Sequence, residues 1–166
     1  EAYLALDVNS IFMQRDNSEM AFYSFTKLLE YAETLPDTSS LDLIKAFTYN
    51  WLGVIQGDYL NLFEGAANSY EKAIEYGQKC GIIYIQIMGM LNMADDYAKL
   101  HNVTESQRFV DRALDLAVQT GDLDDQAFAL GTQAIIHNLC GNYKQAVDAI
   151  HSAIEINKQL DSFWNL

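Results

Sequence analysis

The sequence has little proline and little cysteine, and each shortage excludes something. One proline, Pro36, in 166 residues leaves room for long uninterrupted helices, because proline breaks a helix interior. The two cysteines, Cys80 and Cys140, are too few for a disulfide framework, and no CxxC pair occurs. Each precedes a glycine at an expected turn. We therefore expect buried or idle thiols.

Positive charge is also scarce. The chain has 10 Lys and Arg against 23 Asp and Glu, a formal net charge of −13. A phosphate backbone or an anionic membrane surface would repel such a chain, so we expect no nucleic-acid partner. No apolar run approaches the roughly 18 residues of a membrane span, so we expect no membrane insertion. The charge favours basic or apolar partners.

What the sequence does contain is an internal repeat. Ala73, Ala113 and Ala153 recur at a spacing of 40 residues. The same spacing relates Gly81, Gly121 and Asp161, then Phe63, Val103 and Tyr143, and also Ala66, Ser106 and Ala146. An earlier copy, "SEMAFYSFTKLLEYAETL", lies 45 residues ahead of the next one. The extra residues fall in "TLPDTSS", for which we predict a longer loop.

Each copy has the pattern of two helices. Val110, Ala113, Leu114 and Ala117 follow the i, i+3, i+4, i+7 spacing of a helix with one apolar face. No segment alternates with period two long enough for a strand. We predict left-handed helix ends at the glycines 121 and 141, and capping of the next helix by the aspartates 122, 124 and 125. The predicted helices are 2–15, 18–34, 41–59, 62–79, 82–99, 103–119, 123–139 and 143–159, with a further one starting near residue 162.

Residues 141–153, "GNYKQAVDAIHSA", resemble the tetratricopeptide repeat (TPR) family. The matching residues are Gly141, Asn142, Tyr143, Ala146 and Ala153. "AANSYEKAIE" and "LNMADDYAKLHN" are similar to other parts of the family pattern. The resemblance implies an all-α fold: a right-handed superhelical solenoid of about four helix-turn-helix repeats. The spacing of 40, against about 34 for the family, resembles the longer variety found in bacterial regulators.

We predict one domain over 1–166, with repeats at about 2–35, 41–81, 82–121 and 122–161. The start at Glu1 and the end at "DSFWNL" favour a piece of a longer protein. The host that the resemblance implies is a bacterial signalling protein. Its output domain would be a histidine kinase, a diguanylate cyclase or a transcriptional regulator, with this chain as the sensory or regulatory region.

Catalytic motifs are absent from the sequence. No nucleophile elbow, HExxH motif, P-loop or dinucleotide fingerprint occurs. His137 and Cys140 stand three residues apart and could share a metal, but two ligands alone do not make a site. We therefore expect no enzyme activity, no catalytic residue, no metal and no cofactor.

The resemblance places partner binding on the first helix of each repeat. Trp51 and Tyr59 would be its aromatic anchors. The candidate groove residues are Trp51, Ile55, Asp58, Tyr59, Met88, Leu91, Asp95, Phe128, Ile135 and Asn138. The lysines and arginine with which related domains clamp a chaperone tail are missing. An apolar or amphipathic peptide with basic flanks suits these side chains better.

Two other functions remain open from the sequence. The first is a scaffold that self-assembles through Phe163, Trp164 and Leu166, which would dock on a further repeat. The second is a sensor that takes a small molecule or a metal in the groove. The favoured interpretation is a non-enzymatic module that binds a protein or peptide.

Overall fold

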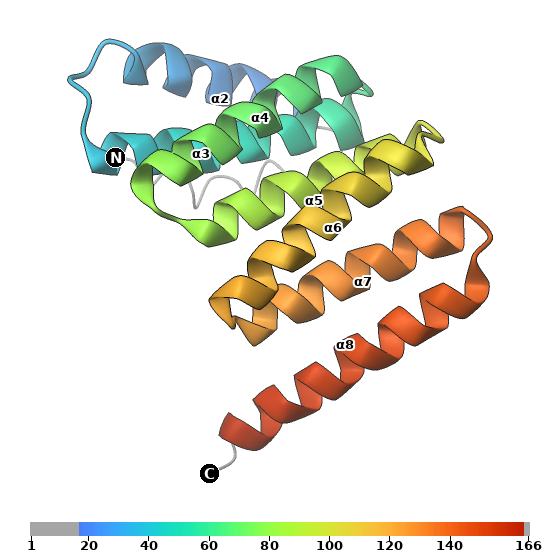
Figure 1. Cartoon of the computed structure of the whole chain (residues 1–166). Helices are drawn as coiled ribbons and strands as arrows, with labels where there is room; N and C mark the ends of the chain where they lie inside the picture. Colours follow the sequence, from blue (N-terminus) through green and yellow to red (C-terminus); the bar gives the residue numbers. More distant parts are fainter. Residues whose placement is uncertain (1–16, 165–166) are drawn as a thin grey trace. The chain divides into compact units, whose positions relative to one another are not determined.

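The computed structural model describes residues 17–164, with side chains for 17–160, and this part of the chain is helical without any strand (Figure 1). The predicted helix over 2–15 lies outside the described residues. The all-α fold class is confirmed. The helices are α2 (Ser18–Ala32), α3 (Ser39–Val54), α4 (Phe63–Cys80), α5 (Ile83–Lys99), α6 (Val103–Thr120), α7 (Leu123–Leu139) and α8 (Tyr143–Trp164), and a π-helical turn, η2 (Ile55–Tyr59), follows α3.

The described residues divide into two compact units, 17–89 and 90–164, and the division falls within α5. In the first unit α3 packs against α2 and α4, with η2 between the same neighbours. In the second unit α7 packs against α6 on one side and α8 on the other. Consecutive helices thus bury their apolar stripes on one another within each unit. That residues 1–166 make one domain stays a prediction.

The 40-residue repeat is visible in the backbone. Asn61, His101 and Gly141 stand 40 residues apart, and all three have positive φ, at 56°, 58° and 75°. Gly121 ends α6 in the left-handed region with φ 71°. The predicted left-handed ends at Gly121 and Gly141 are confirmed. A helix pair therefore turns at the same register in each copy, and glycine meets that geometry without a Cβ penalty.

The small-residue positions of the repeat lie in the core. Ala73 and Ala113 are 0% exposed, and Ser106 is equally buried. The Ser106 hydroxyl donates to the backbone carbonyl of Ala94 at 2.7 Å, so this buried polar group has its partner within the second unit. Small side chains at these positions let neighbouring helix axes approach closely. Most of the apolar sequence is therefore structural.

One predicted helix ends differently. The helix expected over 41–59 is α-helical only to Val54 and continues as the π-helical turn η2. Its wider winding appears in the bond from the Leu60 amide to the Ile55 carbonyl at 3.1 Å, five residues back. Gly57 lies buried in this turn and brings no side chain that would hold the regular winding. Asn61, with φ 56°, then ends the segment.

The last helix also differs from the prediction. Helix α8 runs without a break from Tyr143 to Trp164, whereas an end near 159 and a new start near Ser162 were expected. The position that holds Gly81 and Gly121 in earlier copies holds Asp161 here. Aspartate lacks the freedom of glycine in the left-handed region, so nothing in the local sequence stops the helix.

The start of α3 offers a stability test. Thr38 caps this helix, because its side-chain oxygen accepts from the Leu41 amide at 3.2 Å. Replacing Thr38 with alanine leaves that amide without its acceptor and is expected to lower the unfolding free energy by about 1 kcal/mol. Thr104→Ala, an exposed threonine inside α6, should stay within about 0.5 kcal/mol. Urea denaturation followed by circular dichroism checks both, and equal losses would refute the capping role.

Candidate partner-binding site

Helix α7 carries large apolar side chains on its outer surface. Phe128 is 43% exposed, Ile135 is 54% exposed and Leu139 is 55% exposed. The first two stand seven residues apart, which places them on one face of the helix. The opposite side of α7 packs in the interior through Ala129, Ala134 and Ile136. The helix therefore has an apolar face directed away from its own core.

A depression of about 420 Å³ opens along this face. Gly131 lies between the two exposed apolar side chains, and a Cβ added there would meet no described atom within 4 Å. Helix α8 contributes one residue, Asn157, from across the gap. The lining consists of Asp124, Ala127, Phe128, Gly131, Thr132, Ile135 and Asn157. The surface is mostly apolar, with polar groups at one end.

The N-terminus of α7 places negative charge at that end. The Asp122 side chain caps the helix by accepting from the Asp125 amide at 3.1 Å, which confirms the predicted capping. Asp124 follows in the first turn and lines the depression. Burial raises the pKa of Asp125, and the carboxylates of Asp122 and Asp124 raise it further. A basic group of a partner would find compensating charge here.

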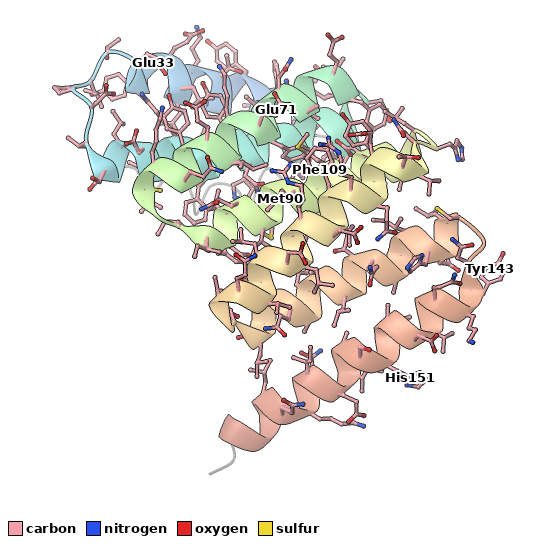
Figure 2. The ribbon with its side chains drawn as sticks, viewed as in Figure 1. Glu33, Glu71, Met90, Phe109, Tyr143 and His151 are labelled. Atoms are coloured by element: carbon pink, nitrogen blue, oxygen red, sulfur yellow. The ribbon has the colours of Figure 1, made fainter. Side chains whose placement is uncertain are left out.

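Helix α8 is held against α7 by small side chains. Ala146, Ala149 and Ala153 of α8 are 6%, 7% and 9% exposed, and they allow close approach of the two helices. The side chain of His151 lies on the side of α8 away from α7 (Figure 2). This packing fixes Asn157 beside the α7 face, so the depression is built by both helices.

The predicted groove residues of the first unit lie in different environments. Trp51 is half-buried and packs against a cluster of Ala21, Phe25, Leu29, Leu52 and Ile55. Ile55 belongs to that cluster and is only 1% exposed, so it offers no surface to a partner. Asp58 is exposed, whereas Tyr59 and Met88 are half-buried. Ile55 is internal because α2 packs on η2, where the π-helical turn begins.

In the second unit the structure brings two of the predicted residues together. Phe128 and Ile135 line the depression. Asn138 is exposed on α7 but is not among the lining residues. Leu91 is 1% exposed and packs in the interior, and Asp95 pairs with Lys99 at 2.6 Å. A binding surface is thus present on α7.

Sequence reasoning missed the polar part of the lining. Asp124 was interpreted only as a cap, and Asn157 was not singled out. A signal for Asn157 exists, because the same repeat position holds Gly77 and Ala117 in the earlier copies. A polar amide in a column of small residues indicates an environment that differs from a closed helix interface.

Other predicted chemistry can be placed as well. Cys80 and Cys140 are free thiols and half-buried. Within the part of the chain that the structure describes, His137 and Cys140 do not belong to any group of three clustered metal-binding side chains. Over the same residues, no helix combines the length and the apolar character needed to cross a membrane. The side chains of Phe163, Trp164 and Leu166 lie outside the described ones.

Comparison with known proteins agrees with the helix pairs. Residues 86–159 match the model of the tetratricopeptide repeat family. This segment runs from α5 into α8 and so includes the helices that build the depression. No curated protein matches the chain. Tetratricopeptide repeats generally act in protein–protein interaction and not in catalysis, and the chain described here is a tetratricopeptide repeat-like protein.

Proposed function

We propose that the depression on α7 binds an apolar or amphipathic peptide with basic flanks. The exposure of Phe128 and Ile135 on either side of the open Gly131 position carries this proposal. Asp124 at one end of the depression and the net charge of −13 favour a basic group next to the apolar part of the peptide. Binding in such a site joins apolar contact with a few polar anchors.

The size of the apolar contact sets the expected affinity. Full burial of a large apolar side chain contributes about 1.5–3 kcal/mol. Phe128 and Ile135 are each about half exposed, so covering both contributes on the order of 2 kcal/mol. That corresponds to roughly 30-fold in affinity. The two side chains are therefore significant contacts, and the partner has to gain the remaining affinity elsewhere on the surface.

A small-molecule sensor is the competing function for this site. The volume of about 420 Å³ falls within the range of ligand pockets. Such pockets, however, enclose most of their ligand, whereas Phe128 and Ile135 are about half open to solvent. The openness of the surface favours a peptide.

The host that we propose is a larger bacterial signalling protein with a kinase, cyclase or DNA-binding output domain. This part of the proposal is supported by the 40-residue period, which resembles the long repeats of bacterial regulators. Sequencing the coding region on both sides of residues 1–166 tests it. An adjoining output domain would support the proposal, and a complete protein without one would contradict it.

The binding proposal predicts a specific loss of affinity. The probe is a labelled 16-residue peptide with leucines at i, i+3, i+4 and i+7 and two lysines at each end, titrated by fluorescence anisotropy. The double change Phe128→Ala with Ile135→Ala is expected to weaken binding roughly 30-fold. The matched control is Met20→Ala with Tyr23→Ala on α2, two side chains of similar exposure. Equal losses in both variants, or none in the first, would refute the assignment.

A further inference from the structure

We propose that the outer face of α8 is a seat for an α-helix of another protein, and that this helix carries acidic residues along one edge. The α8 face is formed by Val147, Ile150 and Ile154, which are 51%, 47% and 41% exposed. Their spacing of three and four residues puts them in one line along the helix. The inference rests on the proposed function, because Asn157 continues this line into the depression on α7.

The repeat shows what normally covers this face. Ile150 occupies the position of Tyr70 in α4 and of Val110 in α6, which are 2% and 0% exposed. Asn157 occupies the position of Gly77 and of Ala117, and both of these are buried. The same positions are thus closed in both earlier copies and open in α8.

A following helix closes those positions. On α6 the cover is α7, and the Gln126 side chain donates to the Ala117 carbonyl at 3.2 Å. On α4 the cover is the first part of α5, where Ile85 packs with Ala73 in a buried cluster. The sequence therefore gives α8 a face of the kind that elsewhere in the chain receives a helix.

The covering helices also indicate which helix would fit. A Cβ added to Gly89 of α5 would come within 2.8 Å of Ile74 of α4, so only a very small residue fits at that crossing. The equivalent position in α7 is Ala129, which is 0% exposed. Ile154 takes the place of Ile74 in the last copy. An occupant of the α8 face should therefore have glycine or alanine where it crosses Ile154.

Charge distinguishes α8 from the earlier helices. Lys144, His151 and Lys158 recur every seven residues and form a basic edge beside the α8 face. All three are exposed, and Lys158 also pairs with Glu155 at 2.7 Å. The equivalent positions are Glu64, Glu71 and Gln78 in α4 and Thr104, Asp111 and Val118 in α6. The edge is acidic or neutral in those two helices and basic in the one whose face is open.

This basic edge decides between two occupants. If a second copy paired through the same face in the antiparallel sense, the two basic edges would face each other, and like charges across a helix pair repel. The net charge of −13 on each copy adds to that repulsion. A helix with acidic residues at seven-residue spacing instead gains ion pairs along the edge. Its other edge faces α7, where Asp124 favours the basic group of the proposed function.

Two synthetic helices test the proposal. Both have 21 residues, the same leucine face with a central alanine, and differ only at three edge positions, which are glutamate in one and lysine in the other. The wild-type chain is expected to bind the glutamate probe about tenfold more tightly at low salt, because three exposed ion pairs are worth a few tenths of a kcal/mol each. Lys144→Glu with Lys158→Glu should reverse this preference. Lys27→Glu with Lys79→Glu, the same charge change on α2 and α4, should leave it intact.

A second variant tests the apolar face. Val147→Ser with Ile150→Ser should weaken both probes at least tenfold, and circular dichroism checks that helicity is kept. If this variant binds both probes as wild type does, or if the charge variants never change the preference, the inference is overturned. The lysine-ended peptide and the Phe128 and Ile135 variants test the proposed function separately. Sedimentation that shows a dimer abolished by the same serine changes would assign the face to a second copy and also overturn the inference.

Discussion

Replacing Tyr70 with alanine is expected to lower the free energy of unfolding of the unit formed by residues 17–89 by about 3–5 kcal/mol. Tyr70 is 2% exposed and is the largest of the fully buried side chains of the described residues. Its ring lies against Gly53 of the preceding helix, which leaves no room for a larger residue. Truncation would empty this space, and the loss includes both the transfer of the ring to water and the cavity left behind.

The matched control is another tyrosine of the same repeat family of helices. Tyr143 is 68% exposed at the start of α8, and Tyr143→Ala is expected to change the unfolding free energy by no more than about 0.5 kcal/mol. Urea denaturation followed by far-ultraviolet circular dichroism measures both variants. Similar losses for the two tyrosines would show that aromatic content and not burial at the helix interface supports this unit, contrary to our expectation.

The helix positions could be predicted because the repeat contains its own punctuation. Gly121 and Gly141 end helices in the left-handed region, and Asp122 begins the next one with a side-chain cap. These signals are local, and they need only a few neighbouring residues to act. The start of the π-helical turn at Ile55 was missed because it depends on packing. Helix α2 covers this turn, and no short pattern in the sequence specifies that contact.

The binding surface was predictable only in part, for a related reason. Phe128 and Ile135 share a helix face, and that much follows from their spacing of seven residues. Whether a side chain on such a face is open depends on what lies over it. Leu91 had the same standing in the sequence and is 1% exposed. Asn157 joins the depression from a different helix, so its role becomes visible only when α8 lies beside α7.

The same dependence gives the last copy of the repeat its functional interest. Ile150 and Val110 hold one position in the repeat, yet their exposures are 47% and 0%. The side chains are chemically similar, so the difference arises from the presence of a following helix and not from the residue. A repeat protein can in this way offer a partner the same contacts that hold its own copies together. The basic edge at Lys144 and Lys158 then adds selectivity for the sign of the partner's charge.

The second large effect concerns two glycines in helix interiors, for which the same substitution should act in opposite directions. An added Cβ at Gly53 of α3 would lie 2.6 Å from Cδ1 of Tyr70, and the rigid ring cannot yield without disturbing the core. Overpacking of this severity costs roughly 3 kcal/mol, and alanine recovers about 1 kcal/mol of helix propensity. Gly53→Ala is therefore expected to destabilise the chain by about 2 kcal/mol. At Gly131 of α7 no described atom lies within 4 Å of the added Cβ, so Gly131→Ala should stabilise it by about 0.5–1 kcal/mol.

A double-mutant cycle isolates the cause at Gly53. In a Tyr70→Ala background the ring is gone, and the added methyl group enters the vacated space instead of striking it. Gly53→Ala should then become neutral or slightly stabilising, which corresponds to a coupling of about 2–3 kcal/mol between the two positions. Urea denaturation of the four proteins gives the coupling directly. If Gly53→Ala costs the same with and without the tyrosine ring, the close approach of α3 to α4 at this point does not depend on Tyr70, and the role assigned to this glycine is wrong.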